Sequence, residues 1–150
     1  MDKIEFLESY ERAKYAEKRT RERIKEYRER ERIASAIRYT AMPRSGDLHD
    51  MSDYICSVES LCDELEQCMH ISDHIKEAIC HSLDSLEEQD EWDILFLKYI
   101  KGMRIGKIAE YLYLSKRTAY RVYTKAIENL VISDIDVKMV EAALAYKRVA

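Results

Sequence analysis

Glycine and proline are scarce in this chain. Its 150 residues include only three glycines and one proline, while 47% of the residues are hydrophobic and 36% are charged. Tight turns in all-β and α/β proteins depend on such turn-forming residues, so their scarcity argues against both fold classes. The composition predicts an all-α protein, and the length limits it to one domain or to a small domain with a helical arm.

Long uncharged runs are missing as well. No stretch of the sequence approaches the roughly 18 apolar residues that a membrane span requires. The charges at Asp2, Lys3 and Glu5 stand where the apolar region of a secretory signal would begin. We therefore expect a soluble, cytoplasmic protein without a membrane partner.

The cysteines and histidines form no strong disulfide or metal pattern. The four cysteines lack a Cys-x-x-Cys pair, which predicts reduced thiols. His70 and His74 stand four residues apart, a spacing that can chelate a metal on a helix, and Cys80 and His81 follow. Because a solvated helix face explains the same pattern, we expect no metal site and no cofactor.

Sequence motifs of enzymes are absent or incomplete. The segment from Gly102 to Lys107 superficially suggests a phosphate-binding loop. However, too few residues separate its two glycines, and Ile108 stands where that loop requires Ser or Thr. No nucleophile elbow or metalloprotease motif occurs in the sequence, and the carboxylates are dispersed. We do not expect an enzyme.

The formal net charge of −4 conceals three blocks of alternating sign. Residues 12–38 carry eleven Lys and Arg against five acids, residues 45–95 carry one Lys against fifteen acids, and residues 96–130 carry eight Lys and Arg against two acids. Nucleic-acid binding depends on the basic face that meets phosphate and not on the total charge. An acidic protein with this distribution can therefore still bind DNA.

Two segments have the alternating three- and four-residue spacing of long amphipathic helices. The first spans residues 3–39, and its inner positions are Phe6, Tyr10, Ala13, Glu17, Thr20, Ile24, Tyr27, Glu31 and Ala34. The second begins at an N-cap on Ser52 or Asp53, and its inner positions are Ile55, Val58, Cys62, Leu65, Met69, Ser72, Lys76, Ile79, Leu83 and Leu86. Pro43 and Gly46 mark a loop at 40–50 between them. We predict a coiled-coil-like antiparallel hairpin over residues 1–84, in which the basic first helix attracts the acidic second helix.

Two further units are predicted after the hairpin. Ser85 to Glu88 has the pattern of a capping box, which would open a helix that ends at Gly102. Residues 85–132 form a compact domain, and residues 133–150 form a final helix with Ser133 as its N-cap. The predicted inner positions of the final helix are Ile135, Met139, Ala142, Ala143 and Tyr146. This helix would serve self-association or pack on the hairpin.

The middle unit has the pattern of a helix-turn-helix. A short helix over 105–112, a tight turn at Tyr113 and Leu114, and an N-cap at Ser115 lead into a helix over 116–129. One arc of this last helix is apolar and carries Ala119, Val122, Tyr123, Ala126 and Leu130. The opposite arc is polar, and residues 115–127 hold four cations and no acid, which favours contact with DNA over a merely solvated face.

The residues predicted to contact DNA lie on this outward arc or on the helix before it. Arg117 and Arg121 can make bidentate contacts with guanine or phosphate, and the helix N-terminus at Ser115 favours a phosphate. Residues of the preceding helix would meet the DNA backbone. The full set is Arg104, Lys107, Ser115, Lys116, Arg117, Thr118, Tyr120, Arg121, Thr124 and Lys125.

The segment from Gly102 to Leu130 resembles the region-four helix-turn-helix of bacterial sigma factors. The resemblance is carried by Ile108-Ala109-Glu110-x-Leu112, by Leu114-Ser115 and by the run from Val122 to Leu130. Nearly the whole chain resembles phage- and prophage-encoded transcriptional regulators of the ArpU/RinA type. Those proteins have a charged helical arm, a loop with Met-Pro and Gly, a heptad helix, and a segment like Leu95-x-Leu97-x-Tyr99-Ile100-x-Gly102 before the helix-turn-helix.

The resemblance implies sequence-specific binding of double-stranded DNA near a phage promoter, in the cytoplasm of a bacterial host. It places the helix over 116–129 in the major groove and makes RNA polymerase a second partner. The sequence departs from the family at the turn, where Tyr113 replaces the usual glycine. Because such regulators commonly pair their DNA-binding units, we expect a homodimer or higher homo-oligomer.

Two alternative functions fit the same sequence pattern. A phage packaging protein of the small-terminase type also joins a helix-turn-helix to a helical oligomerisation region. A coiled-coil interaction module would instead use the acidic helix within 45–95 to bind a basic partner.

Overall fold

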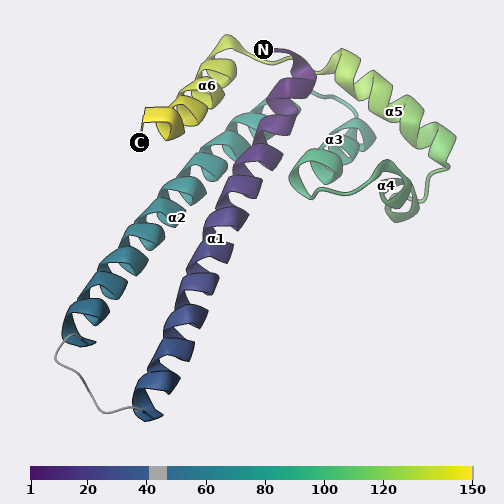
Figure 1. Cartoon of the computed structure of the whole chain (residues 1–150). Coiled ribbons are helices and arrows are strands. Elements are labelled where there is room, and N and C mark those ends of the chain that lie inside the picture. The colour runs from purple at the N-terminus through teal and green to yellow at the C-terminus, as the bar shows by residue number, and fades with distance from the viewer. Residues whose placement is uncertain (41–46, 150) are drawn as a thin grey trace. The chain divides into compact units, whose positions relative to one another are not determined.

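A computed structural model describes residues 1–40 and 47–149. Within these ranges the chain contains helices and connecting loops but no strand, which confirms the all-α prediction (Figure 1). The elements are α1 (Lys3–Thr40), α2 (Asp47–Leu83), α3 (Gln89–Leu95), the π-helical segment η1 (Phe96–Ile100), α4 (Ile105–Tyr111), α5 (Lys116–Asn129) and α6 (Asp134–Val149). None of the helices described is long and apolar enough to cross a membrane.

The chain divides into two compact units. Unit 1 combines Met1–Lys14 with Ile71–Ala150, and unit 2 is Tyr15–His70. The long helices α1 and α2 therefore each contribute to both units. The predicted division after residues 84 and 132 groups the residues differently, because the first turns of α1 and the end of α2 belong with α3 to α6.

Unit 2 is a pair of antiparallel helical segments with a thin apolar seam. The α1 and α2 segments run side by side in opposite directions (Figure 1). Ile24, Leu61 and Cys68 are buried between them, and Tyr27 stacks on Tyr54 with ring centroids 5.7 Å apart. The hairpin predicted from the apolar spacing is present in this unit.

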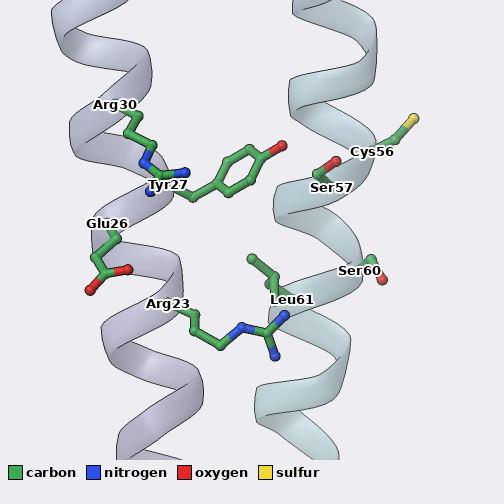
Figure 2. Close-up of a pocket in the computed structure, with 8 residues that line it drawn as sticks. All are labelled: Arg23, Glu26, Tyr27, Arg30, Cys56, Ser57, Ser60 and Leu61. Atoms are coloured by element: carbon green, nitrogen blue, oxygen red, sulfur yellow. The ribbon is translucent and has the colours of Figure 1, made fainter.

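The seam of unit 2 also contains polar and charged groups. Arg23 pairs with Glu64 across the helices at 3.6 Å, as the opposite charges of the two segments predict. Both side chains are largely exposed, so this pair contributes little to stability. A groove between the helices is lined by Arg23, Tyr27 and Arg30 of α1 and by Ser57 and Ser60 of α2 (Figure 2).

The start of α2 differs from its predicted position. The helix already begins at Asp47, so Ser52 and Asp53 lie inside it and neither is the N-cap. Part of the predicted loop over 40–50 is therefore helical, and residues 41–46 lie outside the described ranges.

The predicted register of α2 is confirmed at Ser72, Ile79 and Leu83, which are buried, and is wrong at Ile55, Met69 and Lys76. Ile55 and Met69 are 49% and 41% exposed, and Lys76 is also exposed. The residues directly before the predicted positions Cys62, Met69 and Lys76 are buried. These buried residues are Leu61, Cys68 and Ile75. Their stripe is the more apolar of the two because Lys76 interrupts the other. The α1 seam is confirmed at Phe6, Tyr10, Ala13, Glu17, Thr20 and Ile24, all of which are buried.

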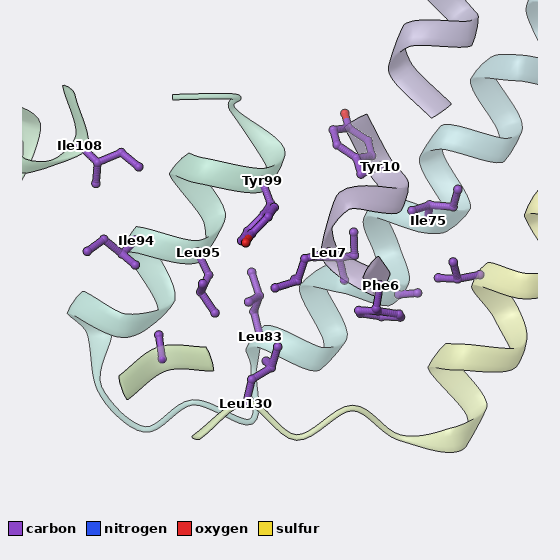
Figure 3. Packing of buried hydrophobic residues seen from close by; sticks show 14 of the residues in the cluster. Phe6, Leu7, Tyr10, Ile75, Leu83, Ile94, Leu95, Tyr99, Ile108 and Leu130 are labelled. Atoms are coloured by element: carbon purple, nitrogen blue, oxygen red, sulfur yellow. The ribbon is translucent and has the colours of Figure 1, made fainter. Parts of the chain in front are cut away.

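Unit 1 has a continuous hydrophobic core to which each of the helices α1 to α6 contributes buried residues. Its fully buried large side chains are Phe6, Leu7, Ile75, Ile79, Leu83, Ile94, Leu95, Ile108, Leu130 and Val140. Figure 3 shows Leu7, Leu83, Leu95 and Leu130 pointing toward one another from four segments of the chain. Burying a side chain of this size stabilises the fold by about 1.5–3 kcal/mol, so this cluster holds the smaller helices in place.

The predicted capping box after α2 is wrong. Helix α3 begins only at Gln89, and its N-cap residue Glu88 makes no side-chain cap. The Ser85 hydroxyl instead accepts a hydrogen bond from the Val131 backbone N–H at 3.1 Å. The C-terminal end is confirmed, because the helical run stops at Gly102 with a left-handed φ of +69°.

The inner face of α6 also differs from the predicted one. Ile135 and Tyr146 are 78% and 58% exposed, while Asp136 and Val140 are buried. The predicted N-cap is confirmed, since the Asp136 N–H donates to the Ser133 hydroxyl at 3.3 Å. A buried carboxylate therefore occupies a position that hydrophobic patterning assigns to solvent.

Asp136 is buried because hydrogen bonds satisfy its carboxylate. Ser82 and Ser133 donate to its Oδ2 at 3.2 and 2.8 Å, and His81 Nδ1 lies 2.9 Å from the same oxygen. The hydrogen bond and charge of Asp136 raise the pKa of His81. Burial raises the pKa of Asp136, but the hydrogen bonds from His81, Ser133 and Ser82 outweigh it and leave that pKa below its ordinary value. This cluster attaches the start of α6 to the end of α2.

We predict that His81→Gln reduces the pH dependence of stability. Because the pKa of His81 in the folded protein lies above its ordinary value of 6.5, the stabilisation is complete below pH 6.5 and is lost as the pH rises through the higher value. The urea midpoint of the unchanged protein should fall as the pH rises from about 5.5 to about 8.5, and that of the variant should fall less. His74→Gln, an exposed change on the same helix, is the control. An identical pH response in the unchanged protein and His81→Gln would contradict the assignment.

Candidate nucleic-acid interface

Helices α4 and α5 form the predicted helix-turn-helix. At the end of α4, the Leu114 N–H donates to the Ala109 carbonyl at 2.8 Å and the Tyr113 N–H donates to the Glu110 carbonyl at 3.3 Å. This pair of bonds is the Schellman pattern, which places one residue in the left-handed region. That residue is Tyr113, with φ at +58°. The turn is therefore where the sequence predicts it, with a left-handed tyrosine in place of glycine.

The N-terminus of α5 is capped as predicted. The Ser115 hydroxyl accepts a hydrogen bond from the Thr118 N–H at 3.2 Å and donates to the Thr118 hydroxyl at 2.8 Å. The other N–H groups of the first turn have no partner within the helix, and the side chains of Lys116 and Arg117 beside them are exposed. This helix end favours a bound anion.

The apolar underside of α5 is packed into the core of unit 1. Ala119 and Ala126 are fully buried and Leu130 is 1% exposed, while Val122 and Tyr123 are half-buried against the core. Alanines at the two closest positions allow α5 to lie near α3 and α4, with which it makes its main contacts. The predicted apolar arc is confirmed.

Three polar contacts fix the position of α5 further. The Tyr123 hydroxyl bonds to the Tyr99 hydroxyl at 2.7 Å, and the Asn129 side-chain amide donates to both carboxylate oxygens of Glu91 at 3.1 and 3.2 Å. Lys3 donates to the carbonyl groups of Ile127 and Glu128 at the C-terminal end of the helix. Burial, and then the bond to Tyr123, raise the pKa of Tyr99, so its hydroxyl stays protonated at neutral pH. These partners lie 24 to 125 residues apart, and no local sequence signal indicates them.

The predicted DNA-contacting residues form an exposed surface of unit 1. Thr118 is half-buried, and the other nine are exposed. The exposed residues are Arg104, Lys107, Ser115, Lys116, Arg117, Tyr120, Arg121, Thr124 and Lys125. A Cβ at Gly106 would lie 3.6 Å from the Lys116 side chain, so α4 meets the start of α5 closely. The cations of both helices therefore belong to one surface, which we call the α5 surface.

The cations of the α5 surface are not neutralised within the described part of the chain. Arg104, Lys107, Lys116, Arg117, Arg121 and Lys125 take part in none of the ion pairs found there. The Thr124 hydroxyl donates to the Tyr120 carbonyl at 2.9 Å, which leaves its oxygen able to accept a hydrogen bond. Two guanidinium groups, two ammonium groups and a hydroxyl on one helix can bind phosphates and the acceptor edges of bases.

The histidine and cysteine pattern considered for a metal does not assemble in the described residues. No group of three or more His, Cys, Asp or Glu side chains there is placed to hold a metal ion. Cys56, Cys62, Cys68 and Cys80 carry free thiols.

We predict that Tyr113→Gly stabilises the fold by about 0.5–1 kcal/mol. A left-handed backbone costs an L-residue about 1–2 kcal/mol, and the greater freedom of glycine in the unfolded chain offsets part of this gain. The side chain is 96% exposed, so its removal sacrifices little packing. Tyr111→Gly, at the exposed last residue of α4, should instead destabilise the protein, by up to about 1 kcal/mol. Urea denaturation measures both changes, and a loss of stability in Tyr113→Gly would show that the tyrosine makes a stabilising contact.

Comparison of the chain with protein-family models, with curated proteins and with solved structures found no match.

Proposed function

We propose that this protein is a sequence-specific, double-stranded-DNA-binding transcriptional regulator of phage or prophage genes. The observation that carries the proposal is the division of α5 into two sides. One side is buried by Ala119, Ala126 and Leu130, and the other presents four exposed cations within residues 115–127, where no acid occurs. None of these cations takes part in an ion pair found among the described residues. A helix of this kind after a tight turn is suited to enter the major groove.

Base recognition is assigned to the middle of α5. Arg117 and Arg121 stand one helical turn apart on the exposed side, and each guanidinium can donate two hydrogen bonds to the O6 and N7 acceptors of guanine. Tyr120 and Thr124 alternate with them and supply an aromatic ring for a thymine methyl group and a hydroxyl for a base or phosphate. Together these side chains can distinguish one sequence from another.

Phosphate contacts are assigned to the ends of the two helices. The capped N-terminus of α5 at Ser115 and the side chains of Lys116 and Lys125 would meet the strands that border the groove. Arg104, directly before α4, and Lys107, in its first turn, would contact the DNA backbone on the other side of the groove. These contacts fix the orientation of α5 on the duplex and carry no sequence information.

The packing of α5 favours tight binding. The contacts of Tyr123 and Asn129 with Tyr99 and Glu91 fix the helix before DNA arrives. A helix that is already ordered loses less conformational entropy on binding. Selectivity then depends on the side chains of the exposed arc.

The proposed regulator acts as a homodimer or higher homo-oligomer together with RNA polymerase. Two copies of the chain would read two half-sites about one helical turn of DNA apart. RNA polymerase is the second partner that the sigma-like pattern favours, and the bacterial cytoplasm is where both partners are found.

We predict that Arg117→Ala combined with Arg121→Ala abolishes selective DNA binding. Each bidentate contact discriminates between bases by about 1–3 kcal/mol, so the double change should remove most of the preference for the duplex fragments that co-purify with the protein over scrambled duplexes. Gel-shift titrations measure this ratio. Arg28→Ala combined with Lys138→Ala removes the same charge from exposed positions elsewhere and should leave the ratio unchanged. Retained selectivity in the arginine variant, with helical content intact, would remove α5 as the reading helix.

We also predict a steep salt dependence of DNA binding. If six or more phosphates are neutralised, affinity should fall roughly a thousandfold or more between about 50 and about 200 mM salt, because bound counterions are released from the DNA. Fluorescence anisotropy over this range measures the slope. A flat response would contradict phosphate binding and favour the protein-interaction function of the acidic helix.

A further inference from the structure

A second basic feature of unit 1 lies beside the α5 surface. A groove of about 400 Å³ separates the α1 residues Glu8, Glu11 and Lys14 from the segment Lys98–Arg104. Tyr10 and Tyr99, each 7% exposed, contribute to its lining from the two sides. Figure 3 shows these two rings on their separate elements. We call this feature the basic groove.

The cations of the basic groove are concentrated on one wall. Lys98, Lys101 and Arg104 all belong to the segment after α3, and the two acids lie on the α1 wall. The Lys98 ammonium lies 5.7 and 5.5 Å from the ring centroids of Tyr99 and Tyr123, and that of Lys101 lies 5.9 Å from the ring of Phe96. Aromatic faces hold an ammonium in place without cancelling its charge, so this wall remains able to bind an anion.

The backbone of this wall is unusual and open. Residues Phe96–Ile100 form a π-helix, a distortion that occurs often at functional sites. It is followed by Gly102, where a Cβ would meet nothing within 4 Å. A ligand can therefore approach the chain closely at this point.

The basic groove is continuous with the α5 surface. Arg104 lines the groove and is also one of the residues predicted to contact DNA. Tyr99 connects the groove wall to α5 through its hydrogen bond to Tyr123. Both features therefore adjoin within unit 1, and a long polyanion bound at α5 would meet the groove as well.

We propose that the Lys98–Arg104 wall binds the phosphate backbone of the DNA that flanks the bases read by α5. This inference rests on the proposed function and extends it to Lys98 and Lys101. A row of cations along an open groove matches the repeated charges of a nucleic-acid strand. The groove adds affinity without adding base selectivity, because backbone contacts carry no sequence information.

The test combines Lys98→Gln with Lys101→Gln and measures DNA binding against salt. Each lost phosphate contact lowers the salt slope by roughly one, so the loss of affinity should be about tenfold larger at about 50 mM than at about 200 mM salt. The ratio of affinities for co-purifying and scrambled duplexes should stay unchanged. Lys98→Arg with Lys101→Arg keeps both charges and should bind as the unchanged protein does. Lys76→Gln with Lys138→Gln, two exposed positions outside the groove, is the charge control.

A second readout uses the length of the duplex. Removal of base pairs from one end, one at a time, should weaken binding of the unchanged protein at the step that removes the flanking phosphates. The Lys98 and Lys101 double Gln variant should show no loss at that step.

The outcomes separate this inference from the proposed function. An unchanged salt slope in the double Gln variant, together with lost selectivity in the Arg117 and Arg121 variant, would overturn the groove assignment and leave the proposed function standing. A double Gln variant that binds DNA normally but no longer binds a polyglutamate peptide would overturn it in favour of an acidic protein partner. Absence of any duplex binding by the unchanged protein would overturn both.

Discussion

The outward position of the α5 cations depends on the burial of the opposite side of the same helix. Ala119, Ala126 and Leu130 are packed in the core, so Arg117 and Arg121 on the opposite side of the helix face solvent. The helix cannot roll without exposing this underside, at a cost of roughly 25 cal/mol for each Å² of apolar surface. The charge pattern of the surface is thus a consequence of hydrophobic packing.

Contacts between distant parts of the chain reinforce this arrangement. Lys3 caps the C-terminal carbonyl groups of α5, and Glu91 holds the side chain of Asn129. Because Glu91 is 2% exposed, its carboxylate requires the hydrogen bonds from the Asn129 amide to offset the cost of burial. The first turns of α1 are therefore part of the unit that carries the candidate interface, although more than one hundred residues separate them from α5.

Local signals in the sequence were sufficient for much of this unit. The N-caps at Ser115 and Ser133, the left-handed terminator at Gly102 and the two sides of α5 depend on neighbouring residues only, and the structure contains each of them. The turn at Tyr113 was also predictable, because spacing and not residue preference positions it.

Features that depend on distant partners were not predictable in this way. Ser85 has the pattern of a helix N-cap, but its hydroxyl accepts a hydrogen bond from the distant Val131 N–H instead. Asp136 resembles a solvent-facing acid, and only its contacts with Ser82 and His81 make burial favourable. In α2 two apolar stripes compete, and the choice between them depends on the facing helix. The contacts that fix α5 belong to the same class, since Tyr99 and Glu91 have no local pattern that identifies their partners.

The central claim is that the exposed side of α5 enters a duplex groove while its underside stays packed. Amide chemical-shift mapping of the isotope-labelled full chain, titrated with its co-purifying duplex DNA, tests this most directly. The account predicts the largest changes in residues 104–107 and 115–125, with residues 15–70 unaffected. Changes confined to residues 15–70, or loss of the packed signals of Ala119 and Ala126 on binding, would contradict it.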